Sequence, residues 1–320
     1  MATNLESRRI MTKVARMYHS RGMRQTEISS LLGISQARVS RLLSSAEEAN
    51  IVRTVVVIPD GLHAELEESL EARFGLTQAH VVEALDDSDE SGLNRDLGDA
   101  AATIFAALTL DEQTVGFTSW SASLRSLSAT LESARQTGRV RVVELLGDVG
   151  PPRMQHEATR ATQRLADQIG ATALFLRAPG VVASPAIRDA IVEQDAHIRE
   201  ALDALDNLDI ALVGIGTCEI HLPLVPGDNF FSEEQFALAK SLGAVGQVNL
   251  RFLDAEGKPV VSELDDLVLG VTLPQLRAAR RRIGVAGGSS KFEAVRAAVR
   301  GAWVDTLITD LRTAERLLAE

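Results

Sequence analysis

The sequence predicts an α/β chain of two domains, a small helical one over residues 1–60 and a larger one with a mostly parallel sheet over residues 61–320. Three observations support this. The chain has 320 residues, which is long for a single small module. A compact helical pattern occupies residues 25–43, and helical segments alternate with apolar β-type runs from residue 94 onward. The two parts also carry charge of opposite sign.

Residues 25–43 have the pattern of a helix-turn-helix. Ile28 and Leu32 give the first helix an apolar face, and Gly33 stands where the tight turn needs a permissive backbone. Ser35 is a good N-cap for the second helix. The apolar residues that would fix this second helix to the core are Ile34, Val39, Leu42 and Leu43.

The second helix leaves polar and basic residues pointing outward near its start. A recognition helix presents such residues to base edges and phosphates. Together with the start of the first helix and the cap, the candidate DNA-binding residues are Gln25, Thr26, Ser35, Gln36, Arg38, Ser40 and Arg41. The alternative is an ordinary helical hairpin with a solvated polar face. The turn glycine, the cap and the outward basic residues together favour DNA binding.

Charge is divided unevenly along the chain. Residues 1–60 hold nine Lys or Arg and five Asp or Glu, a net charge of +4. The whole chain carries −11, so residues 61–320 carry −15. A basic head on an acidic body indicates a DNA-binding module joined to a part that does not bind DNA. Because the head is only mildly basic, we expect one copy to bind weakly at physiological salt.

Two segments between the head and the sheet each allow two interpretations. The β-branched run over residues 51–58 has two interpretations. It is either a wing, which would make the head winged-helix-like, or a first strand that leads outward. Residues 62–74 form a predicted amphipathic helix with Leu62, Leu66 and Leu70 on one stripe. That stripe is a dimerisation seam or packs on its own domain.

Beyond residue 93, predicted helices and strands alternate. The strands span residues 114–118, 140–145, 173–176, 210–215, 247–253, 283–286 and 306–309. The helices span residues 94–108, 121–131, 156–169, 195–205, 232–242, 291–300 and 311–318. This order indicates βαβ units and a Rossmann-like domain with helices on both faces of the sheet. In such domains ligands bind at the carboxyl ends of the strands.

Three loops at those strand ends are rich in glycine and serine. Their candidate ligand-binding residues are Ser119, Trp120, Ser121 and Ser123, then Gly214 and Gly216, then Gly287, Gly288 and Lys291. Free backbone N–H groups where a helix starts, with the charge of Lys291, suit a phosphate or another oxygen-rich anion. Trp120 offers a ring face to a sugar or belongs to the core. Glycine turns are common singly, but three in one sheet favour a ligand site.

The ordered set of motifs resembles the SorC family of bacterial sugar-responsive transcriptional regulators over nearly the whole chain. The resemblance is carried by the helix-turn-helix and by residues 97–102, 116–124, 176–179, 209–216, 243–246, 285–291 and 307–310. It implies a body related to sugar-phosphate isomerases such as glucosamine-6-phosphate deaminase, a tetramer, and a sugar or sugar-phosphate effector. It also implies that residues 119–123 form the first effector loop and that Lys291 is the anion-binding lysine.

Two positions depart from the family pattern. Gln247 stands where the family often has an acid that holds sugar hydroxyls, and we count it among the candidate effector-binding residues. A neutral amide donates and accepts hydrogen bonds and so changes selectivity. Leu146 stands where members that bind a doubly phosphorylated sugar have an arginine. A monophosphate, or an unphosphorylated sugar or polyol, is therefore favoured over a bisphosphate.

The sequence thus predicts a DNA-binding transcription regulator of carbohydrate catabolism. Its expected partners are double-stranded operator DNA, a sugar, polyol or sugar-phosphate effector, and further copies of itself. The alternative is a sugar-phosphate isomerase or deaminase with an appended DNA-binding head. Isomerisation needs a base, and Asp209 and Asp254 are the carboxylates that the sequence brings near the loops, Asp209 at the wrong end of its strand.

The remaining composition predicts a cytoplasmic protein without a cofactor. The single cysteine, Cys218, excludes an intrachain disulfide and favours a reducing compartment. Six scattered histidines have no metal-ligand spacing. The polar start, Met1 to Arg9, is unlike a secretory signal, and no apolar run approaches the roughly 20 residues that span a bilayer, so we expect no membrane partner.

Overall fold

The computed structural model of the protein describes residues 2–52, 61–84, 90–132, 139–220 and 229–320. It divides into two compact units, which we call the head, Met1–Pro59, and the body, Asp60–Glu320. Residues 53–58 of the predicted wing lie outside the described residues, so the wing stays a prediction.

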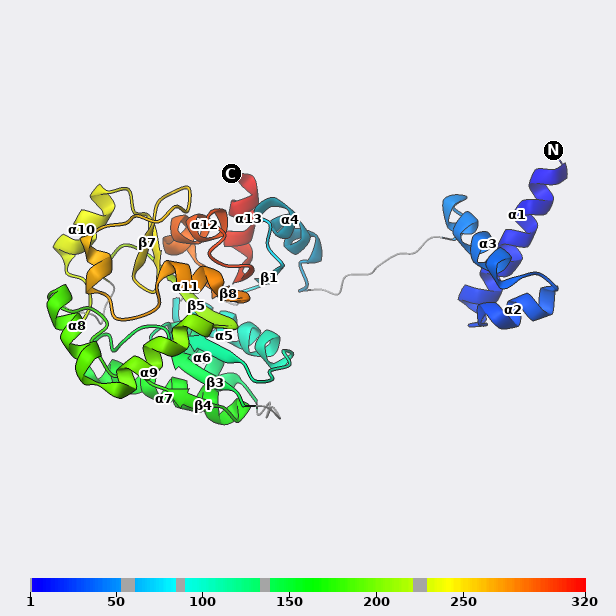
Figure 1. Ribbon diagram of the computed structural model, residues 1–320. Coiled ribbons are helices and arrows are strands. Elements are labelled where there is room, and N and C mark those ends of the chain that lie inside the picture. The colour runs from blue at the N-terminus through cyan, green and yellow to red at the C-terminus, as the bar shows by residue number, and fades with distance from the viewer. Residues whose placement is uncertain (1, 53–60, 85–89, 133–138, 221–228) are drawn as a thin grey trace. The chain divides into compact units, whose positions relative to one another are not determined.

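The head is a bundle of short helices (Figure 1). α1 (Ala2–Ala15) continues into a π-helical turn, Arg16–Ser20, and α2 (Gln25–Leu32) and α3 (Gln36–Glu48) follow. Gly33 joins α2 to α3 with a left-handed backbone, φ 64°, which glycine adopts without strain. The buried core of the bundle is Val14, Met17, Ile28, Val39 and Leu43. The predicted helix-turn-helix is therefore confirmed.

The body contains a sheet whose main strands are parallel and lie in the order β1-β9-β8-β5-β2-β3-β4. These strands are β1 (Gln78–Val82), β2 (Thr114–Phe117), β3 (Arg141–Glu144), β4 (Thr172–Leu174), β5 (Ile210–Gly216), β8 (Arg281–Val285) and β9 (Thr306–Asp310). The hairpin of β6 (Gly246–Val248) and β7 (Arg251–Leu253) joins the sheet because β6 pairs antiparallel with the end of β5. The predicted α/β fold is confirmed.

Helices cover both faces of this sheet (Figure 1). They are α4 (Ala64–Phe74), α5 (Glu90–Ala106), α6 (Ala122–Thr130), α7 (Pro152–Ile169), α8 (Pro185–Gln194), α9 (Ala196–Ala204), α10 (Glu233–Ser241), α11 (Leu273–Ala278), α12 (Phe292–Arg300) and α13 (Leu311–Ala319). One apolar cluster joins α5, α6 and α7 to the sheet, and a second joins α4, α9, α11, α12 and α13 to it. On β5 the side chains alternate between these two clusters, as the two-residue period of a strand requires.

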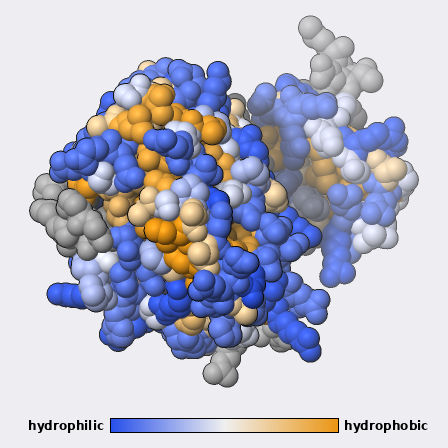
Figure 2. All heavy atoms as spheres, turned by 60° about the vertical axis from the view of Figure 1, so that its left-hand side comes forward, coloured by the Kyte–Doolittle hydropathy of each residue, from blue (hydrophilic) through white to orange (hydrophobic). Residues whose placement is uncertain are grey.

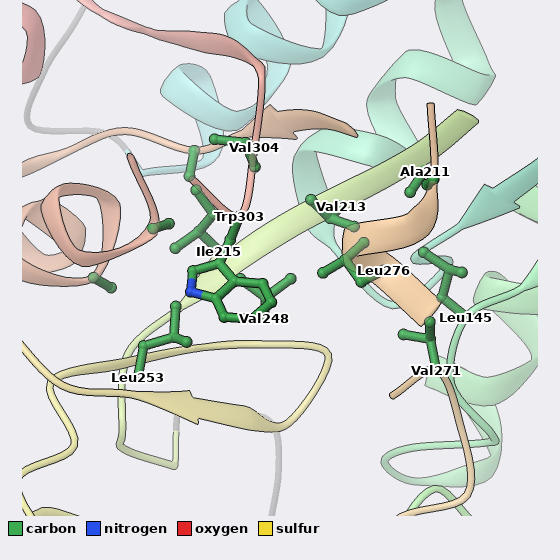
Figure 3. Close-up of a cluster of buried hydrophobic side chains, with 14 of the residues drawn as sticks. Leu145, Ala211, Val213, Ile215, Val248, Leu253, Val271, Leu276, Trp303 and Val304 are labelled. Carbon is green, nitrogen blue, oxygen red and sulfur yellow. The ribbon is translucent and has the colours of Figure 1, made fainter. Parts of the chain in front are cut away.

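The second cluster fixes the carboxyl end of β5 (Figure 3). Val213 and Ile215 of β5 belong to the same buried cluster as Leu276 of α11 and Trp303. The indole Nε1 of Trp303 is satisfied because it donates a hydrogen bond to the carbonyl oxygen of Gly257 at 2.7 Å. The last residues of β5 are thus held by packing on a well-filled core.

Two strand predictions are wrong for identifiable reasons. The single strand predicted over residues 247–253 is the β6–β7 hairpin, because Asn249 and Leu250 have positive φ values of 49° and 61° and reverse the chain. β1 forms at the sheet edge, where the sequence predicts no strand. Its apolar signal is short, since only Ala79 and Val81 of its five residues are buried.

The leucine stripe before and within α4 packs mostly on the body itself. Leu70 is fully buried, and Leu66 packs against the same cluster. Leu62, which precedes the helix, is 60% exposed. Of the two interpretations of this stripe, packing on its own domain is therefore correct for Leu66 and Leu70.

Candidate functional sites

The outward surface of α3 has the composition that the sequence predicts. Gln36, Ala37, Arg38, Ser40 and Arg41 are all exposed, while Val39 and Leu43 of the same helix are buried. At the start of α2, Thr26 is exposed and Gln25 is half-buried. The candidate DNA-binding side chains on α3 are therefore free of the core and share one exposed surface of the head.

Capping interactions fix the two helices of the motif. The Ser35 hydroxyl accepts a hydrogen bond from the backbone N–H of Arg38 at 3.3 Å, as an N-cap does. The Glu27 carboxylate accepts from the backbone N–H of Arg24 at 2.8 Å, which ties the start of α2. The Ser29 hydroxyl donates to the carbonyl oxygen of Ile34 across the turn at 2.5 Å. The exposed residues of α3 are thus carried on an ordered element.

In the body, three loops meet around the carboxyl end of β5. A β-carbon built on Gly214 would lie 2.8 Å from the Ser121 hydroxyl oxygen, so Ser121 occupies the space that a side chain would take. The hydroxyls of Ser121 and Ser123 are 3.3 Å apart, and Ser123 donates to the carbonyl oxygen of Val285 at 3.4 Å. The ends of β2, β5 and β8 are therefore in contact through two serines and one glycine.

Gln247 reaches the same edge from the β6–β7 hairpin. Its Oε1 accepts a hydrogen bond from the backbone N–H of Leu250 at 2.8 Å. Its Nε2 lies over Gly216, 2.2 Å from where a β-carbon on that residue would be. The oxygen already makes one hydrogen bond, and the two Nε2–H donors have no bond of their own among the described residues. The side chain is therefore better placed to donate to a ligand than to accept from one. The expectation that this amide both donates to and accepts from a ligand stays a prediction.

Asn249 and Thr118 are neighbours of this site that sequence reasoning missed. The Thr118 hydroxyl donates to Asn249 Oδ1 at 2.8 Å, and both side chains are buried. The Asn249 Nδ2 atom is buried with no hydrogen-bond partner among the described residues. A buried unpaired donor is costly, so this atom is available to donate to a ligand oxygen or to a water molecule. The positive φ of Asn249 cannot be read from an apolar strand-like run.

The loop after β8 is fixed by a buried carboxylate, Asp310. Its Oδ2 accepts from the backbone N–H of Gly288 at 2.7 Å, and its Oδ1 accepts from the backbone N–H of Thr313 at 3.0 Å. A β-carbon on Gly287 would lie 2.2 Å from Asp310 Oδ2, so the loop needs glycine there. The sequence argument, which brought only Asp209 and Asp254 near the loops, therefore missed Asp310. The signal for Asp310 is its position between an apolar strand and an amphipathic helix, which is typical of an N-cap.

Lys291 follows this loop and is short of counter-charge. Its side chain is 21% exposed, and its Nζ lies 3.8 Å from Oε1 of Glu90, a side chain that is itself 73% exposed. Burial lowers the pKa of Lys291 below its usual value, and Glu90 opposes this effect only in part. A partly desolvated ammonium with one distant, solvated partner is well suited to an incoming anion. Among the described residues, no hydrogen bond or ion pair joins Lys291 to Ser121 or Gln247, which lie at the same edge of the sheet.

Trp120 packs against other aromatic side chains, so its ring is not fully free to stack on a sugar. Its ring is half-buried and meets Phe230 edge-to-face, with ring centroids 6.0 Å apart. It also packs against the apolar cluster of Phe231, Phe236 and Phe252. Its indole Nε1 is buried without a partner among the described residues. Trp120 is therefore part of a core cluster that still has one donor to offer.

Two further carboxylates that the sequence analysis missed lie at the end of β3: Glu144 is its last residue, and Asp148 follows it. Glu144 is buried and accepts from the Thr162 hydroxyl at 2.9 Å and from the backbone N–H of Leu176 at 3.0 Å. Burial raises the pKa of Glu144, and it also raises the pKa of Asp148, which lies 3.6 Å from Arg177. Glu144 joins β3 to the segment after β4, and so supports this end of the sheet.

The carboxylates that the sequence proposed have structural roles. Asp209 accepts from the backbone N–H of Thr114 at 3.0 Å, at the amino end of β5, as expected. Asp254 accepts from the backbone N–H groups of Glu256 and Lys258 in a turn after β7.

Within the described part of the chain, no cluster of three or more His, Cys, Asp or Glu residues could hold a metal ion. No helix in that part is long and apolar enough to cross a membrane.

A separate groove of about 1220 Å³ lies on the body. None of its lining residues belongs to the candidate ligand loops. Its apolar lining includes Val192, Leu202, Val261, Leu273, Pro274 and Trp303. Figure 2 shows apolar side chains gathered on the face of the body that it turns forward, with polar residues around them. Val261 is 80% exposed, and Ile187 of α8, a helix that also lines the groove, is 46% exposed.

Comparison with known proteins identifies the family. Residues 61–319 match the family described as "Putative sugar-binding domain". The chain is 31% identical to the deoxyribonucleoside regulator of Bacillus subtilis (strain 168), over 98% of each protein. It is 29% identical to the sorbitol operon regulator of Klebsiella pneumoniae, over 98% of this chain and 99% of that protein. The crystal structure of the full-length Klebsiella regulator matches with a TM-score of 0.73 and 28% identity, over 97% of this chain and 98% of that one.

The chain is a transcriptional regulator whose body is of the sugar-binding class. It belongs to the SorC family of bacterial transcriptional regulators. The resemblance drawn from the order of its motifs is thereby confirmed.

Proposed function

We propose that the chain controls transcription of a carbohydrate operon in the cytoplasm, with a sugar, polyol or sugar phosphate as effector. The observation that carries this proposal is the meeting of Ser121, Ser123 and Gln247 with Gly214 and Gly216 at the carboxyl end of β5. Ligands of parallel α/β sheets bind at this edge. The donors found there, with Lys291 beyond β8, favour an oxygen-rich and anionic ligand.

The head would read the operator through α3. Its exposed Gln36, Arg38 and Arg41 are the side chains that reach base edges and phosphates from such a helix. Effector binding regulates this step only when the ligand has different affinities for two arrangements of the assembly. In this proposal the DNA site lies in the head and the effector site lies in the body. The oligomer couples them, because the arrangement that the effector favours sets how two heads fit the operator.

An isomerase or deaminase activity is not part of this proposal. Asp310 is the carboxylate closest to the loop after β8, but both of its oxygens accept hydrogen bonds from backbone N–H groups, and Oδ2 also accepts from the Thr313 hydroxyl at 2.6 Å. Asp310 is also buried, 3% exposed, whereas a general base must come within hydrogen-bond reach of the proton that it removes. A coupled assay on the purified chain with sugar phosphates should therefore detect no interconversion.

Replacing the outward residues of α3 should change DNA recognition. We expect Gln36→Ala and Arg38→Ala to relax sequence preference, at about 1–3 kcal/mol per lost base contact. Arg41→Ala should weaken binding to all sequences more evenly if Arg41 contacts phosphate. Gel-shift titrations on a selected duplex and on its scrambled version measure both effects, and Arg300→Ala on the body is the control. Unchanged binding in all three head variants would show that α3 does not read DNA.

Removing the charge at Lys291 should abolish the response to effector while DNA binding persists. A charge-assisted contact is worth roughly 1.5–3 kcal/mol, so Lys291→Ala should lose about tenfold or more in effector affinity. Calorimetry with ligands found in a thermal-shift screen measures this loss, because a ligand specific to the native state raises the melting temperature. Lys258→Ala, at an exposed turn, is the matched control. Equal affinity of wild type and Lys291→Ala would place the ligand elsewhere.

Gln247→Glu tests the donor at the end of the hairpin with little change of shape. The variant keeps an oxygen to accept from the Leu250 N–H but replaces the Nε2 donor with a charged acceptor. We expect affinity for anionic ligands to fall about tenfold or more, since a charge-assisted hydrogen bond contributes roughly 1.5–3 kcal/mol, and neutral polyols to lose much less. Gln194→Glu adds the same charge at an exposed position. Equal losses for anionic and neutral ligands would contradict a donor role.

We further propose that the working unit is a homo-oligomer, most simply a tetramer formed as a dimer of dimers. Two mildly basic heads on one assembly raise the local concentration of the second head at its half-site. A dimer would pair with a roughly palindromic operator. Because Leu66 and Leu70 are packed within the body, the exposed apolar surface beside the groove is the better candidate for subunit contact.

Two aspartate variants distinguish the possible contact surfaces. We expect Val261→Asp, beside the groove, to shift the protein toward smaller species, because the charge would be desolvated in an interface. Leu62→Asp should leave the assembly unchanged if α4 is not the seam. Light scattering at micromolar concentration measures the mass of each. A wild-type chain that is monomeric with and without effector and on operator DNA would overturn the oligomer.

A further inference from the structure

One surface of the head carries positive charge only. Residues 7–26 contain no Asp or Glu and six Lys or Arg. Five of these cations, all exposed, line a hollow of about 460 Å³ along α1 and the π-helical turn. They are Arg8, Arg9, Lys13, Arg16 and Arg21, and we call this surface the α1 basic face. By contrast, α3 carries Arg38 and Arg41, so most of the positive charge of the head lies away from the recognition helix.

Within the part of the head whose side chains the structure describes, these cations have no acidic partner. None of the ion pairs between described residues involves any of the five cations. Arg9 and Lys13 are four residues apart and Lys13 and Arg16 are three apart, spacings at which like charges on a helix repel. The repulsion would be relieved by a polyanion that covers the face. The π-helical turn that carries Arg16 is a rare geometry often found at functional sites.

The other side of α1 limits the kind of polyanion. Val14 and Met17 are buried in the core of the head, and Ile10 packs against them. A helix that binds a lipid surface needs its apolar face free for insertion, and this one is occupied. The α1 basic face therefore offers charge and hydrogen-bond donors without an apolar component, which suits the regularly spaced phosphates of a nucleic-acid backbone.

We propose that the α1 basic face binds backbone phosphates of double-stranded DNA outside the base pairs read by α3. The proposal rests on the proposed DNA-binding function and adds a second contact surface to it. The two surfaces have different roles. Phosphate contacts from the α1 basic face supply affinity and position the head, and base contacts from α3 specify sequence. With only two cations on α3, the α1 basic face is the main source of electrostatic affinity.

The test is the salt dependence of DNA binding in a triple variant, Arg9→Gln, Lys13→Gln and Arg16→Gln, in the full-length chain. Arg160→Gln, Lys258→Gln and Arg300→Gln, all exposed on the body, make the matched control with the same change in net charge. Each protein is titrated with a duplex selected from a random library and with a scrambled duplex, between 50 and 200 mM salt. Far-UV circular dichroism confirms that the variants are folded.

We expect the triple variant to bind both duplexes more weakly by the same factor, with its sequence preference unchanged. Each lost phosphate contact makes the slope of log affinity against log salt shallower by roughly 0.9. Without three contacts, the fall in affinity between 50 and 200 mM salt should therefore be about 40-fold smaller in the triple variant than in wild type. The control should match wild type. Binding to the scrambled duplex measures the contribution of phosphate contacts alone. This measurement therefore does not depend on finding an operator.

A triple variant with the wild-type slope on both duplexes would overturn the proposal. If Arg38→Ala still lost sequence preference in that case, the DNA-binding function would stand and only the α1 basic face would be excluded. Binding of wild type but not of the triple variant to phosphatidylglycerol vesicles, with unchanged DNA slopes, would assign the face to a membrane surface and also overturn it.

Discussion

The candidate effector site depends on a steric constraint at the end of β5. Gly214 and Gly216 have no side chains, and the space that a β-carbon would need is taken by the Ser121 hydroxyl and the Gln247 amide. A larger residue at either position would push away one of the two segments that line the edge. Because Val213 and Ile215 are anchored in the core, β5 cannot move aside to relieve such a clash. Packing thus brings together segments that are far apart in the sequence.

The chemistry of this edge follows from which polar atoms are already bonded. The oxygens of Gln247 and Asp310 accept hydrogen bonds from the backbone, and Asn249 accepts from Thr118. What remains for a ligand is mainly donors and the partly desolvated charge of Lys291, whose pKa is lowered by burial. We expect a site with these atoms to discriminate between ligands by charge, because an anion gains more than a neutral hydroxyl from accepting these hydrogen bonds. The supporting carboxylates hold loops in place through hydrogen bonds to the backbone.

The sequence was informative where periodicity and caps decide the structure, and less so where distant residues meet. The helix-turn-helix, the alternating strands and the glycine-serine loops follow from local patterns such as Gly33 and Ser35. The hairpin at 247–253 was not predictable, because an apolar run conceals the positive φ of Leu250. The role of Glu144 depends on Thr162 and Leu176, which only the folded sheet brings near it. The same holds for the donor bias of Gln247, which depends on that hairpin.

Hydrogen–deuterium exchange with and without an effector tests most directly the claim that the ligand binds at the carboxyl end of β5. A sugar phosphate found by thermal-shift screening should slow exchange together in residues 118–123, 214–217, 247–250 and 287–291. Backbone N–H groups exchange more slowly when a ligand stabilises the local fold. Protection of all four segments would support the account. Protection confined to the groove beside α8 and α11, with these segments unchanged, would contradict it.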